Sequence, residues 1–238
     1  MSFGLQVTTD SGEWVVNEQV PALHYLGQAV FVGAVGDGVA GEQIGKYRIT
    51  SSAAPFVLLR MAVNSAASSG RVVNVGTNLW EIDVFGDPSA VLCYGPLGSA
   101  APQEPWGLRV WDAAGNVTFD TTRFPLWVSE VFSLTGSSGT FPNAAPFPAG
   151  ITLARSYTAP AIAAYSAGSY FRSIGAAGNP GSITNDIRRL GWQRTATGYV
   201  PVWLYTALGT YSITTVSYDH YSSGIAGHSI LVAETTGL

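Results

Sequence analysis

One short pattern occurs twice in this chain, and it restricts the fold more than any other feature. The segments Phe3–Gly12 and Trp106–Gly115 both start with an aromatic residue followed by Gly-Leu-x-Val, and both end in a short polar turn that closes on glycine. An alternating strand that runs into such a turn is typical of a β-hairpin. Because the pattern repeats along the chain, it predicts two related β modules.

The glycine that ends each copy has a structural explanation. In the second copy, Asp112–Gly115 suits a type I turn whose closing glycine takes a positive φ and forms a β-bulge, with a return strand over 116–120. In the first copy, Asp10–Gly12 is expected to make the same turn before a return strand over 13–17. Both glycines are therefore predicted to be structural residues.

Period-two alternation of apolar and polar residues recurs elsewhere, as in Trp80–Phe85 and Tyr211–Val216. Segments rich in Val, Thr, Tyr, Trp and Ile between frequent glycines and prolines are typical of strands and turns. The expected fold is all-β, with two β-sandwich-like or small-barrel modules. The first module covers residues 1–104, and the second, longer and aromatic-rich, covers 105–238.

Two segments depart from this strand pattern. Gly98–Pro105 has the composition of a linker between the modules. Ser182–Leu190 is compatible with a short turn of helix, capped by Ser182 or Thr184.

Charge is scarce and unevenly placed. Only 11% of the residues are charged, against about 25% in typical soluble domains; Lys46 is the only lysine, and no lysine or arginine follows Arg194. Free monomers normally keep charge on their surface for solubility, so we expect partners to cover much of this surface. The alternative is a neutral Ser/Thr/Gly surface on a monomer. A net charge of −4 without a basic patch argues against a nucleic-acid binder.

The termini and the cysteine content exclude other classes. Met1–Gln6 has neither the basic region nor the apolar core of a signal peptide. No stretch approaches the roughly 20 apolar residues of a spanning helix, so no membrane span is expected. Cys93 is the only cysteine, which rules out a disulfide within the chain, and it is predicted to be a buried apolar residue.

Several groups could carry chemistry, and each has a simpler structural explanation. Gly36–Gly41 matches G-x-G-x-x-G, but Gly45 interrupts the helix that dinucleotide binding requires. His220 and His228, with Asp219, lack the further ligands of a metal site. A Ser-His-Asp triad is spatial and stays open, although no Gly-x-Ser-x-Gly elbow supports one.

Glu81 and Asp83 are two apart on one strand face, as the acids of a glycosidase can be, and also as in any polar strand face. A depolymerase using Glu81, Asp83 or Asp219 is therefore the enzymatic alternative. The favoured interpretation is that the chain is no enzyme and has no catalytic, cofactor-binding or metal-binding residues, and no cofactor.

Aromatic residues gather near the C-terminus: Trp192, Tyr199, Trp203, Tyr205, Tyr211, Tyr218 and Tyr221. Aromatic side chains fill β cores, anchor protein interfaces and bind sugars. Core packing is the first expectation for this group, a protein interface the second and saccharide contact the third.

The segment Trp106–Thr122 resembles a motif of tail proteins from long-tailed bacteriophages, Tyr/Trp-Gly-Leu-x-Val-aromatic-Asp/Asn-x-x-Gly-x-x-x-Phe-Asp. Met1–Val7 is similar to the N-terminal version of this motif. Trp80–Gly86 is similar to the strand that often precedes it. The resemblance does not extend beyond Pro125, so any specialised role is expected after that residue.

This resemblance implies a structural virion component of the distal tail: a tail-tip, baseplate or fibre-attachment protein without catalytic residues. Its implied partners are other phage tail proteins and further copies of itself, with a trimer favoured. It would reside in the virion after synthesis in the host cytoplasm without a signal peptide. The alternative is a receptor-binding tail-fibre domain whose C-terminal module contacts a host-surface saccharide or protein.

Overall fold

A computed structural model describes the backbone in ten stretches: residues 5–9, 12–16, 22–36, 43–98, 104–140, 149–163, 168–176, 181–213, 219–225 and 228–238. Twenty strands and no helix occur in these stretches, and the strands pair antiparallel. None of the sheets that these stretches form closes into a barrel. The predicted all-β, sandwich-like fold is therefore confirmed.

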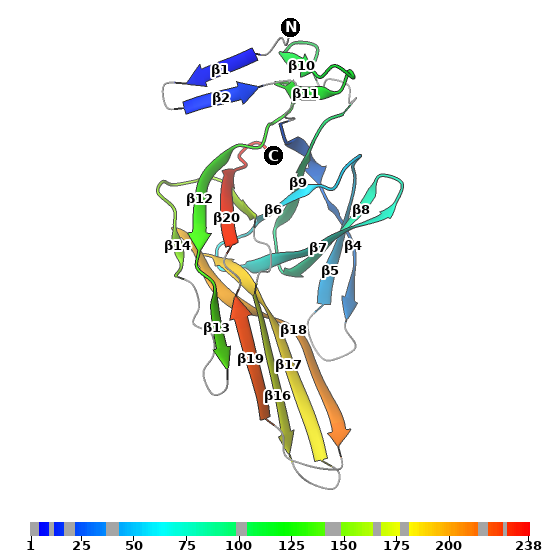
Figure 1. The fold of residues 1–238 in the computed structure, drawn as a ribbon, viewed down its shortest axis with the longest axis vertical. Helices are drawn as coiled ribbons and strands as arrows, with labels where there is room; N and C mark the ends of the chain where they lie inside the picture. The colour runs from blue at the N-terminus through cyan, green and yellow to red at the C-terminus, as the bar shows by residue number, and fades with distance from the viewer. Residues whose placement is uncertain are drawn as a thin grey trace.

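One large sheet has six strands in the order β12-β20-β15-β6-β9-β3 (Figure 1). Their bounds are β3 (His24–Gln28), β6 (Phe56–Arg60), β9 (Ala90–Gly95), β12 (Val128–Leu134), β15 (Pro160–Ala163) and β20 (His228–Glu234).

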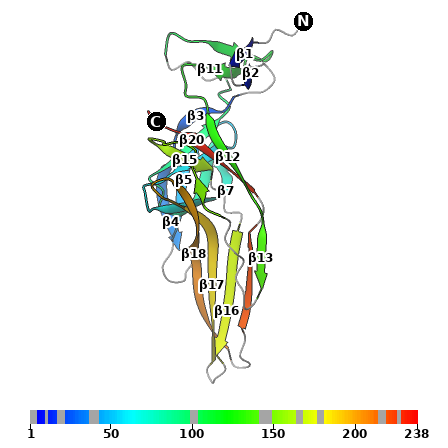
Figure 2. The ribbon, with the colours of Figure 1, turned by 90° about the vertical axis from the view of Figure 1, so that its left-hand side faces the viewer.

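The other large sheet has ten strands. Its main order is β13-β19-β16-β17-β7-β8-β5-β4, and β18 pairs with both β17 and β14. Figure 2 shows β16, β17 and β18 running together away from the body of the molecule. The bounds are β4 (Val30–Gly36), β5 (Gln43–Thr50), β7 (Ala66–Gly76), β8 (Leu79–Gly86), β13 (Ser137–Thr140), β14 (Ile151–Thr152), β16 (Gly168–Ala176), β17 (Gly181–Arg194), β18 (Gly198–Ile213) and β19 (Asp219–Ile225).

The segment Ser182–Leu190 belongs to β17, so the helical turn expected there is wrong. This strand pairs with β16 on one side and with β18 on the other. Strand preference depends on cross-strand neighbours more than on local composition. Two long partners therefore override the local preference of Asn185 and Asp186.

Both large sheets combine strands from either side of residue 104. In the six-stranded sheet, Ala161 of β15 lies opposite Arg60 of β6. In the ten-stranded sheet, Trp192 of β17 lies opposite Ala67 of β7. The boundary suggested by the repeat is thus not a boundary between sheets, and most of the expected linker, residues 99–103, lies outside the described residues.

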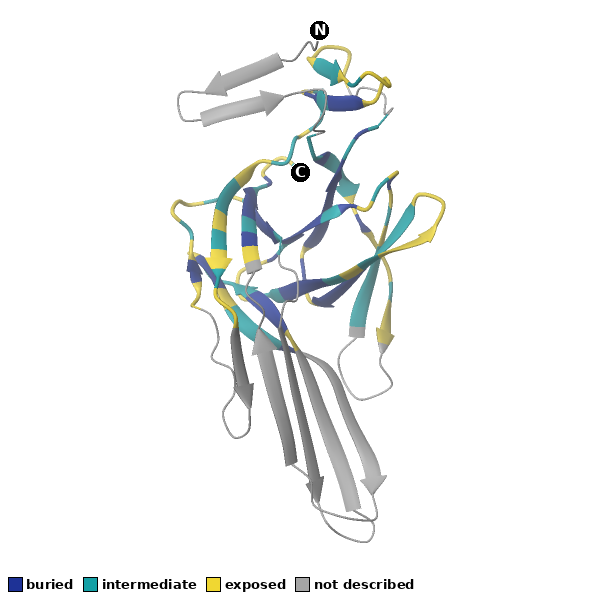
Figure 3. Cartoon of the chain, viewed as in Figure 1, coloured by how far each residue is buried: buried dark blue, intermediate teal, exposed yellow. Residues whose placement is uncertain are grey.

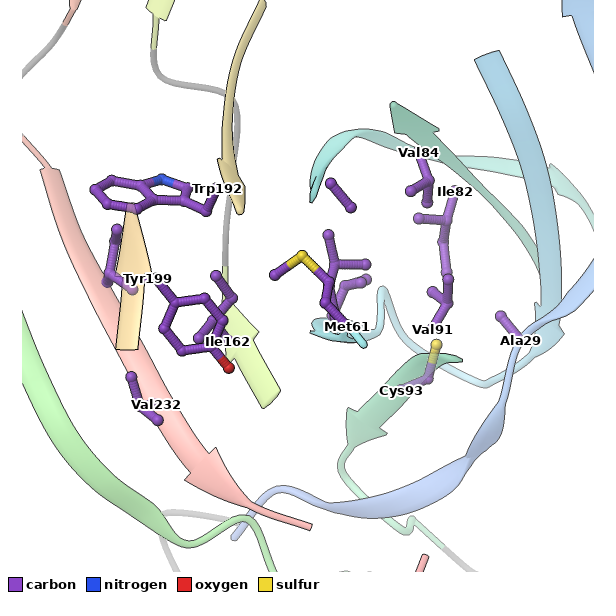
Figure 4. Packing of buried hydrophobic residues seen from close by; sticks show 14 of the residues in the cluster. Ala29, Met61, Ile82, Val84, Val91, Cys93, Ile162, Trp192, Tyr199 and Val232 are labelled. Carbon is purple, nitrogen blue, oxygen red and sulfur yellow. The ribbon is translucent and has the colours of Figure 1, made fainter. Parts of the chain in front are cut away.

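The main core fills the space between the two large sheets (Figures 3 and 4). Period-two alternation explains it, because every second residue of a strand faces the same side. On β8, Ile82 and Val84 are fully buried, and Val91 and Cys93 of β9 meet them from the other sheet. The remaining members come from neighbouring elements: Ala29, Val57, Leu59, Met61, Ala67, Ile151, Ile162, Trp192, Tyr199, Ile230 and Val232.

A second cluster lies on the opposite face of the six-stranded sheet. Leu58, Leu92 and Tyr94 are its largest buried members. β9 is consequently buried on both faces, and all six of its residues are buried. Leu23, directly before β3, and Leu238 pack against this cluster.

The two repeated segments form hairpins at the same end of the molecule (Figure 1). The first joins β1 (Leu5–Thr9) to β2 (Gly12–Val16), and the second joins β10 (Arg109–Trp111) to β11 (Val117–Asp120). The prediction of two hairpins is confirmed.

Their turns differ. In the second hairpin, Gly115 has a φ of +85°, its amide donates to the Asp112 carbonyl at 3.1 Å, and the Asp112 amide donates to the Asn116 carbonyl at 2.8 Å, as the predicted turn and bulge require. A separate register shift lies between Val110 and Trp111. The Asp112 carboxylate accepts hydrogen bonds from the amides of Ala114 and Asn116 at 2.9 and 2.8 Å. In the first hairpin, the register runs without a shift from Leu5 to Thr9, which pairs with Gly12. The described strands of that hairpin therefore contain no bulge.

Candidate functional site

β8 carries the two carboxylates that the sequence singled out. Ile82 and Val84 point into the core, so Glu81 and Asp83 share the opposite face, as predicted. Asp83 is only 6% exposed. Because burying a carboxylate is costly unless the carboxylate is paired, its partners determine what this face can do.

β5 supplies two of these partners in register. Lys46 lies opposite Asp83 and forms an ion pair with it, while its Nζ is 3.4 Å from a Glu81 oxygen. Arg48 lies opposite Glu81, and its Nε and Nη2 donate to one carboxylate oxygen at 3.0 and 2.8 Å. The hydrogen bond from Arg48 holds the pKa of Glu81 below its usual value. A general acid at neutral pH needs a raised pKa, so Glu81 is tuned in the opposite direction.

β7 supplies the third partner through a β-bulge. The register between β7 and β8 shifts between Ser69 and Val72. Two residues, Gly70 and Arg71, therefore lie opposite Asp83, and a bulge of this kind re-aims a side chain. Arg71 Nε donates to Asp83 Oδ2 at 2.7 Å, and this hydrogen bond raises the pKa of the guanidinium. The Arg71 side chain is nevertheless 69% exposed.

These residues border a cavity of about 440 Å³ on the outer face of the ten-stranded sheet. We call it the cationic pocket. Three cations line it, Lys46, Arg71 and Arg189, together with Asp83 and Gly70. Its apolar lining residues, Val35, Ile44 and Phe85, are called the apolar wall.

Two features shape the cationic pocket. The Arg189 guanidinium lies over the Phe85 ring, 5.8 Å from its centroid, which is a cation–π arrangement. A Cβ added to Gly70 would lie 2.8 Å from Phe85 Cε2 and 3.0 Å from Asp83 Cβ. Glycine is therefore the residue that fits between Phe85 and Asp83 at this point of the bulge.

The pocket has more positive than negative groups. Three cations and one carboxylate line it, and the adjacent Arg48–Glu81 pair is neutral. This excess stands out in a chain whose net charge is −4. A concave site with one sign of charge concentrates ligands of the opposite sign, so the arrangement is suited to holding an anion.

A second group of titratable side chains joins the second hairpin to the body. His24 is fully buried, its Nδ1 is 3.0 Å from the Ala22 carbonyl, and its Nε2 is 3.1 Å from the Asp120 amide. The amide can only donate, so Nε2 accepts and Nδ1 carries the hydrogen of a neutral ring. Burial lowers the pKa of His24, in agreement with that neutral form.

Asp120 sits beside this histidine with no exposed surface. It forms an ion pair with Arg109, whose Nε donates at 3.0 Å, and its other oxygen accepts from the Thr122 amide at 2.8 Å. Burial opposes ionisation, but the Thr122 and Arg109 hydrogen bonds outweigh it and lower the pKa of Asp120. We call His24, Arg109, Asp120 and Thr122 the hairpin seat.

The structure places several other predicted residues. Cys93 is buried as predicted, and burial raises the pKa of its thiol to about 12. Trp192 and Tyr199 are fully buried, which confirms core packing for these two aromatics. β5, a strand, follows the glycine-rich segment at Gln43, whereas dinucleotide binding requires a helix there.

Other candidates fall outside what the structure describes. The side chains of His220, His228 and Asp219 are not described, although their backbones lie on β19 and β20. The same holds for Tyr205, Tyr211 and Tyr221, and Tyr218 lies wholly outside the described residues, as do residues 37–42.

Sequence reasoning missed the cations around Asp83 and the whole hairpin seat. A signal existed for the first: Lys46 and Arg48 alternate on one strand as Glu81 and Asp83 do on another. Nothing comparable marks Arg71 or Arg189, because a bulge and a distant strand bring them to the pocket.

In the stretches that the structure describes, no group of three or more His, Cys, Asp or Glu side chains is placed to hold a metal ion. The same stretches contain no helix with the length and apolar character needed to cross a membrane. The chain matches no protein-family model, no curated protein and no solved structure.

Proposed function

We propose that this chain is a structural, non-enzymatic subunit of the distal tail of a bacteriophage, in the tail tip, the baseplate or the fibre attachment. The proposal rests on the tail-protein motif in Trp106–Thr122. The observation that supports it best is that the hairpin formed by this motif exposes large aromatic side chains.

Trp106 is 87% exposed, and Trp111 is more than half exposed. Phe124 and Trp127, just beyond the hairpin, are each more than half exposed as well. Aromatic side chains anchor protein interfaces when they become buried there. A hairpin fixed to the body through the buried hairpin seat and carrying exposed tryptophans is suited to docking on a neighbouring subunit.

The edge of the ten-stranded sheet has a similar character. β4 is the last strand of that sheet, and Val30, Phe31 and Val32 are exposed on successive positions, hence on both faces. Proteins normally cover or charge such an edge because it invites pairing with another chain. Coverage by neighbours in an assembly accounts for an apolar edge here.

The partners in this proposal are other tail proteins and further copies of the chain, with a trimer favoured and the virion as the location. Trimeric assembly is expected to appear as three times the 25.0 kDa chain mass in light scattering after size-exclusion chromatography. A monomer at all concentrations would remove the self-association from the proposal and leave the tail role to be tested separately.

The test of the tail role uses particles of the phage that encodes the chain. We expect mass spectrometry to find the chain in purified virions and cryo-electron microscopy to place it at the distal end of the tail. Trp106→Ser combined with Trp111→Ser should reduce its incorporation, whereas the matched exposed change Val75→Ser should not. Absence from intact particles, or a location in the capsid, would refute the proposal.

A second candidate function is contact with a host-surface saccharide or protein. One observation favours it: the cationic pocket is concave and exposes Arg71. The C-terminal aromatics named in the sequence give less support, because Trp192 and Tyr199 are in the core. The enzymatic alternative predicts saccharide hydrolysis that Glu81→Gln abolishes, and we expect no turnover.

A further inference from the structure

We propose that the cationic pocket binds an acidic saccharide, with a sugar carboxylate held by Arg71 and Arg189 and the sugar ring against the apolar wall. In biological terms this inference rests on the second candidate function, contact with a host surface. The binding itself requires only the purified chain.

Arg71 is arranged to receive a carboxylate. Its Nε donates a hydrogen bond to Asp83 Oδ2 at 2.7 Å, which orients the guanidinium plane. Most of the side chain is exposed to solvent. No residue that the structure describes accepts a hydrogen bond from its Nη groups. A planar guanidinium with free Nη donors matches the two oxygens of a carboxylate.

Arg189 supports the same ligand from a different strand. It is exposed, its guanidinium lies over the Phe85 ring, and none of the carboxylates whose side chains the structure describes forms an ion pair with it. Lys46 adds charge from the base of the pocket, since it is largely buried between Glu81 and Asp83. The ligand's negative charge would therefore meet two accessible guanidinium groups rather than the lysine.

The size and lining of the pocket favour a sugar over a simple ion. At about 440 Å³ it falls within the roughly 300–1,000 Å³ typical of small-molecule sites. A phosphate or sulfate ion would leave the apolar wall of Val35, Ile44 and Phe85 unused. The C–H face of a pyranose ring can cover such a wall while its carboxylate reaches the arginines.

The strand pairing disfavours an extended acidic peptide. Peptides that bind to sheets usually add a strand to a free edge. β5 and β8, which carry Lys46, Asp83 and Phe85, each pair with a neighbour on both sides, whereas the described pairing of β7 with β17 covers only Ala66 and Ala67. β5 and β8 therefore offer a ligand only side chains, which suits recognition through functional groups.

The pocket also has room for more than one sugar unit. A second cavity of about 470 Å³ shares Gly70 and Arg71 with it and is lined by Pro55, Phe56 and Ala163 among others. Arg71 therefore lines both the cationic pocket and the second cavity. A disaccharide with its carboxylate at Arg71 fits this arrangement better than a single sugar does.

The experiment is a calorimetric titration of the full chain with digalacturonate, its dimethyl ester and an Asp/Glu-rich peptide of equal charge. We expect saturable binding of digalacturonate only, weakened at least tenfold by Arg71→Gln and by Gly70→Val. Arg48→Gln, a cation outside the pocket lining, should leave the affinity unchanged. Circular dichroism and thermal melting establish that each variant is folded.

The outcomes separate the alternatives. Equal binding of the dimethyl ester would show that the carboxylate is not recognised and would overturn the proposal. Tighter binding of the peptide than of digalacturonate would also overturn the proposal and would indicate a protein partner. If none of the three probes bound, the pocket would not be a binding site. None of these three results bears on whether the chain is found in the tail, which virion imaging tests.

Discussion

The hairpin seat and the cationic pocket are built around the same pair, an aspartate and an arginine on adjacent antiparallel strands. Arg109 Nε donates to Asp120 at 3.0 Å, and Arg71 Nε donates to Asp83 at 2.7 Å. The arginine side chain is 13% exposed in the seat and 69% exposed in the pocket. The comparison shows that exposure and surplus charge, rather than the pair itself, separate a structural contact from a candidate binding site.

The largest effect is expected from removing the arginine of each pair. Arg109→Gln leaves the buried Asp120 carboxylate without its cation, and breaking a buried pair on one side costs about 3 kcal/mol or more in free energy of unfolding. Arg71→Gln leaves Asp83 paired with Lys46 and should not change stability measurably. Urea denaturation of both variants measures the difference, and equal losses would contradict the comparison.

A change at the base of the pocket should have a smaller effect. Gly70→Ala places a Cβ 2.8 Å from Phe85 Cε2, and overpacking of this kind costs about 1–3 kcal/mol in stability. Gly76→Ala, on the same strand, meets Leu79 Cβ at 3.6 Å and serves as the control. If both substitutions proved neutral in thermal denaturation, Gly70 would not be required for the shape of the pocket.

The seat should weaken as the pH falls. The pKa of His24 is lowered in the folded chain, so below about pH 6.5 the unfolded chain binds a proton that the folded chain does not. Stability is therefore full above that pH and declines on acidification, by up to about 1.4 kcal/mol between pH 7.5 and 5.5. Asp120, whose pKa is also lowered, adds a loss in the same direction below about pH 4.

The measurement is a urea unfolding curve at each pH for the wild-type chain and for His24→Gln. The variant should be less stable at pH 7.5 and should lose less stability between the two pH values. A pH dependence identical to that of the wild-type chain would mean that another group titrates.

The smallest effect is expected at the Arg48–Glu81 pair, beside the pocket. Arg48 is 43% exposed in its pair with Glu81. Exposed pairs contribute less than about 1 kcal/mol and are screened by salt. Arg48→Gln should therefore change the melting temperature slightly at low salt and not at 0.5 M salt, and a large loss at both salt concentrations would show that the pair is structural.

The sequence predicted the strands better than their partners. Alternation located β8 within a residue or so, and the Asp-Ala-Ala-Gly turn predicted the positive φ of Gly115. Local patterns have this power because side-chain period and turn conformation depend on neighbours in sequence. The local pattern gave a wrong prediction of a helical turn at Ser182–Leu190, because pairing with β16 and β18 determines the structure there.

The site was harder to predict for the same reason. The sequence showed that Glu81 and Asp83 share one face, but the cations that make the pocket positively charged come from β5, β7 and β17. The bulge that aims Arg71 at Asp83 is a property of the pairing, and Gly70 within the strand is only a weak sequence signal for it. His24 and Asp120 are far apart in the chain and meet only through the tertiary fold.

The most direct test of the contrast between the two regions is an NMR titration of the ¹⁵N-labelled chain with digalacturonate, which follows each backbone amide. We expect saturable shifts centred on Gly70, Arg71 and Arg189, with the amides of His24 and Asp120 unchanged. Absence of saturable shifts, or shifts centred on the hairpin seat, would contradict it.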